Sequence, residues 1–170
     1  MDRAALRSEV MASNETSYET RVRWVGAHSL DPLGPRSYTR DLLVEPPGKP
    51  PILGSASSRY FGDDDRYNPE DLMLASLGEC HLLTYLALAA KAGIRVTALS
   101  AQVSGTIAKI EGKMRFREAT IRVSTEIEAG ADAERAQQLH EPAHEQCFMA
   151  SSVNFPVQIA ATVTKASGSK

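Results

Sequence analysis

The stretch over residues 68–93 constrains the fold more than any other part of the chain, because it predicts one long helix that is apolar on every side. Asn68 is a typical N-cap residue, Pro69 suits the first helical position, and acidic residues follow in the first turn, where they complement the helix dipole. Large apolar residues then occur all round the helix (Leu72, Met73, Leu74, Leu77, Leu82, Leu83, Leu86 and Leu88). A helix that is apolar all round must be buried, so its central residue Cys80 is predicted to be a thiol inside a core.

Length and charge limit the classes of protein that this chain can belong to. It has 170 residues, which favours one domain, and its net charge of -2 gives no reason to expect a nucleic acid or an anionic membrane as partner. Residues 1–17 lack an apolar core typical of a secretory signal and are expected to form a flexible arm ahead of a single domain over 18–170. The protein is therefore expected to be cytoplasmic. The helix approaches the length of a membrane span, but Glu79 and His81 in its middle argue against that interpretation.

Alternating apolar and polar residues predict β-strands on both sides of the long helix. Two of them precede it, a hairpin that turns at Glu111, Gly112 and Lys113 follows it, and a second, Pro-interrupted helical segment leads to a last strand. The predicted strands cover 18–27, 38–45, 94–111, 114–128 and 155–165, and the second helix covers 131–140 with Asp132 as N-cap. A slip in the alternation near Glu118 indicates a β-bulge. This order predicts an α+β fold with an antiparallel sheet and with both cysteines on helices.

A sheet of this size covers only one side of a helix that is apolar all round. The second helical segment and a second copy of the protein are the available covers for the other side, so we expect a homodimer.

The only two cysteines, Cys80 and Cys147, lie far apart in the sequence. A reducing cytoplasm disfavours a structural disulfide, so they are either two inert core residues or a redox couple. A thiol in an apolar helix has a raised pKa, and it needs a nearby cation to react at neutral pH. Arg59 and Arg66, in the polar loop ahead of the helix, are candidates for that cation, and Glu70 at the start of the helix offers a carboxylate for bidentate pairing.

One other motif in the sequence has the pattern of a zinc site. His140 and His144 match H-E-x-x-H, but Pro142 lies between them and no further histidine or carboxylate follows Glu145. A zinc site is therefore not expected, even with Cys147 as a third ligand, and no cofactor is predicted.

The segment Asn68-Pro69-Glu70, with Cys80 ten positions after Glu70, and the segment from Ala143 to Cys147 together resemble the OsmC/Ohr family of thiol-dependent peroxidases. Ser58 to Gly62 looks like the arginine segment of that family. The resemblance implies an intertwined α+β dimer that reduces organic hydroperoxides and uses a lipoyl-type dithiol as reductant. It implies that Cys80 is the peroxidatic thiolate and Cys147 the resolving thiol, with Arg59 as the activating cation and Glu70 as its anchor.

Three features depart from the family pattern. Glu79 precedes Cys80 where many relatives have a small apolar residue, Phe148 follows Cys147 in place of a common proline, and Arg66 could replace Arg59. Two other classes of function also remain open from the sequence. One is a non-catalytic redox-sensing or small hydrophobic ligand-binding protein, and the other is a structural dimer whose cysteines only fill the core.

Overall fold

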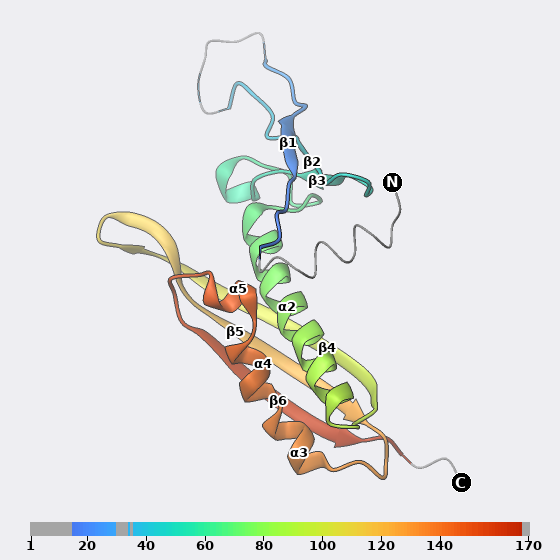
Figure 1. The fold of residues 1–170 in the computed structure, drawn as a ribbon. Coiled ribbons are helices and arrows are strands. Elements are labelled where there is room, and N and C mark those ends of the chain that lie inside the picture. The colour runs from blue at the N-terminus through green and yellow to red at the C-terminus, as the bar shows by residue number, and fades with distance from the viewer. Residues whose placement is uncertain (1–14, 30–33, 35, 168–170) are drawn as a thin grey trace. The chain divides into compact units, whose positions relative to one another are not determined.

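The computed structural model describes residues 15–29, 34 and 36–167, so the predicted arm over residues 1–17 lies almost entirely outside the described residues. The chain divides into two compact units, Met1–Pro69 and Glu70–Lys170, which are described separately below (Figure 1). The N-terminal unit contains strands and one 3-10 turn, and the second unit combines α-helices with strands, so the chain as a whole has the predicted α+β class.

The N-terminal unit contains an antiparallel three-stranded sheet in the order β1-β2-β3. Strand β1 (Arg21–Trp24) and strand β2 (Leu42–Glu45) occupy the predicted segments but are shorter. Strand β3 (Ile52–Gly54) was not predicted, because the proline-rich turn just before it leaves only three residues for pairing. A single 3-10 turn, η1 (Ser58–Tyr60), follows in the loop that leads to the long helix.

The second unit places its helices on one face of a three-stranded sheet (Figure 1). The long helix is α2 (Pro69–Lys91), and the sheet has the order β4 (Val96–Ile110), β5 (Lys113–Ile127) and β6 (Val157–Lys165). Strands β4 and β5 are antiparallel as predicted, but β6 runs parallel to β5. The antiparallel prediction was therefore wrong for β6, because the helical segment between β5 and β6 carries the chain back to the start of β5 before the last strand begins.

The hairpin between β4 and β5 confirms the predicted turn and the predicted β-bulge. Glu111 and Gly112 have positive φ angles of 50° and 82°, as a tight two-residue hairpin turn requires. The register shifts between Thr106 and Ile107, which pair with Glu118 and Phe116 respectively, so Arg117 is the extra residue of a bulge.

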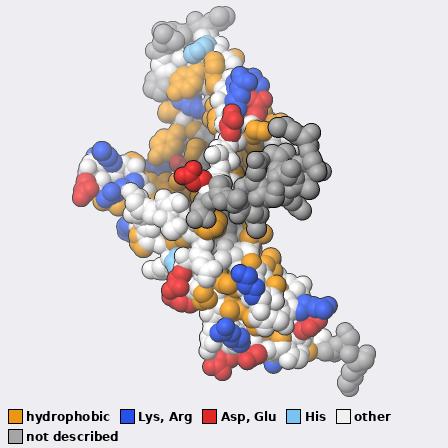
Figure 2. All heavy atoms as spheres, in the orientation of Figure 1, with side chains coloured by type: hydrophobic (Ala, Val, Ile, Leu, Met, Phe, Trp, Pro, Cys, Tyr) orange, Lys and Arg blue, Asp and Glu red, His pale blue; other side chains and the backbone are white. Residues whose placement is uncertain are grey.

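Helix α2 buries only one of its faces within the described chain. Leu77 packs against β5, and Tyr85 and Ala89 pack in a second apolar cluster with Ile94 and Ile127. The opposite face is open, and Leu83 there is 59% exposed. Apolar side chains reach the surface of this unit among scattered charged ones (Figure 2). The prediction that α2 is buried all round is therefore wrong for the single chain, because its own sheet and short helices cover only one side.

Length and composition alone would allow α2 to cross a membrane, and it is the one helix among the described residues that passes this test. Its fully buried residues Leu77, Tyr85 and Ala89 nevertheless pack against the sheet and the short helices. This one-sided packing is the arrangement expected of a core helix in a layered α+β fold.

The helical segment after β5 is broken at a different place from the one predicted. It forms α3 (Ala133–Gln138), α4 (His140–Glu145) and α5 (Phe148–Ser151), with Leu139 between the first two. Asp132 caps α3 as predicted and accepts a hydrogen bond from the Arg135 amide at 3.0 Å. Pro142 does not interrupt a helix, because it lies in the first turn of α4, where a missing N–H removes no intrahelical bond.

Candidate active site

The two cysteines, distant in the sequence, meet in the second unit. Cys80 lies in the middle of α2 and is partly exposed, whereas Cys147 lies between α4 and α5 and is fully buried. The Cys147 side chain is hydrogen-bonded to that of Cys80, and both cysteines are free thiols. A pair of thiols in contact across two different segments is the arrangement from which a disulfide can form.

Cys147 is held as the cap of a short helix and not inside one. Its sulfur accepts a hydrogen bond from the Ala150 amide at 3.4 Å, so it is the N-cap of α5. The prediction that both cysteines lie on helices is therefore correct for Cys80 only. The sequence could not reveal this, because cysteine is not a typical N-cap residue.

The Cys147 thiol loses its proton less readily than an ordinary cysteine does. Burial raises the pKa of Cys147 from 9.0 to about 11, and the interaction with Cys80 adds to this effect, while the Ala150 amide opposes it. Cys147 is therefore a protonated thiol at neutral pH. Cys80 is the more accessible member of the pair, so a molecule in solution meets Cys80 first.

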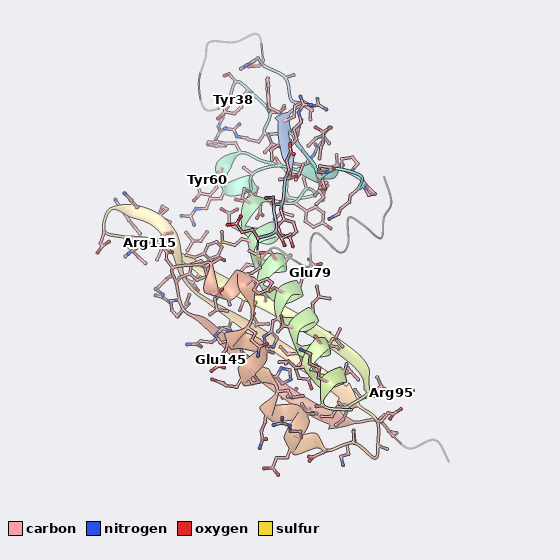
Figure 3. The ribbon with its side chains drawn as sticks, in the orientation of Figure 1. Tyr38, Tyr60, Glu79, Arg95, Arg115 and Glu145 are labelled. Carbon is pink, nitrogen blue, oxygen red and sulfur yellow. The ribbon has the colours of Figure 1, made fainter. Side chains whose placement is uncertain are left out.

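A cavity of about 500 Å³ is lined by residues close in sequence to both cysteines, although neither cysteine lines it. It is lined by Thr84, one turn after Cys80, and by Gln146 and Phe148, the two neighbours of Cys147. The Thr84 hydroxyl donates a hydrogen bond to the Cys80 carbonyl at 2.8 Å, which fixes it against α2. This volume lies in the range of small-molecule sites. Glu145 also lines this cavity and projects from α4 (Figure 3).

The candidate cations Arg59 and Arg66 both lie in the N-terminal unit, but among its described residues only Arg66 forms ion pairs. Arg66 forms ion pairs with Asp41 at 3.5 Å and with Asp63 at 3.2 Å. Arg59, on the 3-10 turn η1, is exposed and has no ion-pair partner in the described part of its own unit. Arg59 is therefore the guanidinium that is free to serve another group.

The turn that carries Arg59 has a strained backbone next to it. Phe61 caps η1 with a φ angle of 63°, which a bulky side chain rarely adopts. The guanidinium carbon atoms of Arg36 and Arg40 lie 4.8 Å and 5.3 Å from the centre of the Phe61 ring. These cation–π contacts help to hold the aromatic ring in place.

The two predicted carboxylates lie at different points of α2. Glu70 is partly buried in its first turn and has no ion-pair partner in the described part of the second unit, so it is available for an arginine. Glu79 is exposed and lines a separate apolar cavity of about 450 Å³ with Leu82, Leu83 and Leu86 (Figure 3). Its carboxylate is therefore hydrated and not enclosed with the thiols.

A buried polar network in the second unit was not foreseen from the sequence. Nε2 of His81 on α2 lies 3.2 Å from Nδ1 of His140 on α4, and Nε2 of His140 lies 3.3 Å from the Thr125 hydroxyl. The Tyr85 ring stacks on His140 at 4.0 Å. Burial lowers the pKa of His81 to about 4, helped by the nearby His144, and burial likewise lowers the pKa of His140 to about 4, helped by His81.

Within the described residues, no group of three or more histidine, cysteine or acidic side chains has a geometry that could hold a metal ion. His140 instead serves as a hydrogen-bond partner in the core. One sequence signal for this network was present, namely a histidine directly after Cys80 in an otherwise apolar helix.

Comparison with protein families matches residues 62–162 to the OsmC-like protein family, which covers more than half of the chain and includes Glu70 and both cysteines. The chain belongs to the OsmC-like family. Comparison with curated proteins gives no significant match.

Solved structures agree with this assignment of family and fold. An OsmC-like protein of unknown function from Vibrio cholerae is 23% identical, with a TM-score of 0.74 over 88% of this chain and 100% of that chain. An organic hydroperoxide resistance protein from Elizabethkingia anophelis is 21% identical, with a TM-score of 0.63 over 89% of this chain and 99% of that chain. The organic hydroperoxide resistance protein OhrB of Bacillus subtilis is 17% identical, with a TM-score of 0.60 over 88% of this chain and 98% of that chain.

Proposed function

We propose that this OsmC-like protein is a cysteine-based peroxidase that reduces organic hydroperoxides to alcohols. The observation that carries the proposal is the contact between one accessible thiol, Cys80, and one buried thiol, Cys147. Two cysteines that only fill a core would not need to be in contact. They would also not need one partly exposed thiol and one buried thiol. Structural neighbours named as organic hydroperoxide resistance proteins support the choice of substrate class.

The first chemical step uses Cys80 as nucleophile. Its thiolate attacks the distal oxygen of the hydroperoxide, the O–O bond breaks, and the alkoxide leaves and takes up a proton to become the alcohol. Cys80 is then a sulfenic acid. Arg59 stabilises the thiolate and the charge on the leaving oxygen, and Glu70 orients the guanidinium by a bidentate ion pair.

The second step uses Cys147. Its sulfur attacks the Cys80 sulfur, the S–O bond breaks, and hydroxide combines with the Cys147 proton to leave as water. A dithiol, for which we propose the lipoyl type, then opens the disulfide by thiol exchange and restores both thiols. The raised pKa of Cys147 suits this order of events, because a protonated thiol does not compete with Cys80 for the peroxide.

The shape of the site favours a hydroperoxide with an apolar tail. The side chain of Phe148, which is 80% exposed, lines the cavity of about 500 Å³ and offers apolar surface to a bound alkyl chain. Leu77, another apolar residue one turn before Cys80, is fully buried in the core and cannot contact a ligand.

The open face of α2 supports a proposal about the assembly of the protein. A second copy of the chain would cover Leu83 and Leu86 and remove them from water, so we propose a homodimer. We also propose a cytoplasmic location, where reduced dithiols are available.

Rapid mixing of the reduced protein with an alkyl hydroperoxide and excess dihydrolipoamide tests the proposed function. We expect repeated turnover that stops when Cys80 is replaced by serine. A wild-type protein that forms the disulfide once but does not turn over would instead be a redox sensor. Unchanged peroxide consumption by the Cys80→Ser variant would show that Cys80 is not the nucleophile.

A further inference from the structure

The strongest feature that the proposed reaction leaves unexplained is the histidine pair, His81 and His140. Both residues are almost fully buried, at 0% and 3% exposure, and their ring nitrogens approach within 3.2 Å. One neutral ring must donate and the other accept, so the two imidazoles hold complementary tautomers. Thr125 on β5 and the ring of Tyr85 fix His140 from two further sides.

This pair is one of two directional contacts in a mostly apolar interface, the other being the Tyr85 hydroxyl, which donates a hydrogen bond to the Ala136 carbonyl at 3.2 Å. Around it, Tyr85 and Ala89 of α2 pack with Ala136, Leu139 and Ala143 of the α3–α4 segment. Small apolar contacts are non-directional, so a shift of one helix along the other costs them little. A buried hydrogen bond between ring nitrogens is lost by the same shift, which leaves two unpaired polar atoms in the core. The histidine pair therefore favours one register between α2 and α4, and the Tyr85 hydrogen bond supports the same register at α3.

The same two segments carry the two thiols. His81 directly follows Cys80 on α2, and His140 opens α4, seven positions before Cys147. His144 belongs to the same cluster, since its ring lies close enough to lower the pKa of His81 electrostatically. The His144 carbonyl accepts a hydrogen bond from the Cys147 amide at 3.2 Å. A change of register at the histidine pair would therefore move Cys147 relative to Cys80.

We propose that His81 and His140 are positioning residues that hold Cys147 in reach of Cys80, and so govern disulfide formation. The inference rests on the proposed function for its place in a catalytic cycle. In that cycle it concerns the second step, in which the S–O bond of the Cys80 sulfenic acid breaks, the S–S bond forms, and water leaves with the Cys147 proton.

Equilibration with glutathione redox buffers tests this proposal without any peroxide. The ratio of disulfide to dithiol then measures the effective concentration of Cys147 at Cys80. The His140→Phe variant keeps a ring against Tyr85 but removes the hydrogen bond. We expect it to lower the effective concentration at least tenfold, which raises the reduction potential of the pair by about 30 mV. His81→Leu breaks the same hydrogen bond from the other side and should have the same effect if His140→Phe folds poorly.

Two further variants separate positioning from mere stability. The double variant His81→Gln with His140→Asn replaces the two ring nitrogens by amide groups that can bond each other, so it should return the effective concentration to within threefold of wild type. Glu141→Gln changes an exposed residue of the same helix and should leave it unchanged. Full wild-type effective concentration in both apolar variants, or a double variant as impaired as His140→Phe, would overturn the proposal.

The two proposals fail in different ways. A wild-type protein that forms the disulfide in glutathione buffer but never consumes hydroperoxide contradicts the peroxidase activity alone. A protein that consumes hydroperoxide while His140→Phe keeps the wild-type potential contradicts the positioning role alone. In the active protein, His140→Phe should form the Cys80 sulfenic acid at the normal rate and accumulate it, which a 1,3-dicarbonyl trap and intact mass would detect.

Discussion

Mild acid should weaken the folded state through the two buried histidines. The pKa of each lies near 4 in the native protein and near 6.5 in an unfolded chain, because burial disfavours the charged imidazole. The unfolded state therefore binds more protons below pH 6.5, and the free energy of unfolding falls as the pH drops from there toward 4. Linkage gives a loss of about 2 kcal/mol per histidine between pH 7 and pH 5, or roughly 3.5 kcal/mol for the pair.

Urea unfolding of the reduced protein, at fixed protein concentration and at half-unit steps from pH 7 to pH 5, measures this loss. The His140→Phe variant should lose about half of the pH dependence, because only His81 remains to take up a proton on unfolding. The His28→Gln variant, which alters an exposed histidine of the N-terminal unit, should keep the wild-type slope. A wild-type unfolding free energy that is flat across this range, or a slope unchanged in His140→Phe, would refute the reasoning.

Three further predictions concern the reaction and the assembly. Replacement of Cys147 by serine should allow one turnover and then over-oxidation of Cys80, seen as added oxygen by intact mass, whereas normal cycling would exclude Cys147 as the resolving thiol. Arg59→Ala should slow the reaction of Cys80 with an alkyl hydroperoxide by about 100-fold, and Arg66→Ala should slow it far less because Arg66 is already paired with two aspartates, so equal effects in stopped-flow measurements would contradict the choice of Arg59. Leu83→Glu should shift the protein from dimer to monomer in sedimentation experiments, because it puts a charge on the open face of α2, and an unchanged wild-type dimer would place the interface elsewhere.

The sequence predicted most accurately those features that depend on local chemistry. The limits of α2 follow from its N-terminal proline and from Gly93, which adopts a positive φ angle of 71° after the helix. The hairpin turn and the bulge follow from the alternation of apolar residues on either side of them. Each of these features is decided by a few neighbouring residues, so a single sequence carries enough information.

Features that depend on distant partners were harder to predict. Nothing near β6 in the sequence specifies that it pairs parallel to β5, since the direction is set by the path of the intervening helical segment. His140 and His144 were considered only as metal ligands, because their spacing in the sequence says nothing of His81, which pairs with His140 from another helix. Our proposal of Arg59 in place of Arg66 likewise rests on the ion pair between Arg66 and Asp41, which the sequence alone does not reveal.

The left-handed backbone of Phe61 has a consequence for how its neighbour Arg59 can act. A non-glycine residue in that conformation costs about 1–2 kcal/mol, and two cation–π contacts at exposed positions can return a similar amount. A turn balanced in this way has one preferred backbone shape before any substrate arrives. The guanidinium of Arg59 can then change its position by rotation about four side-chain bonds, without a change in the backbone shape of the turn.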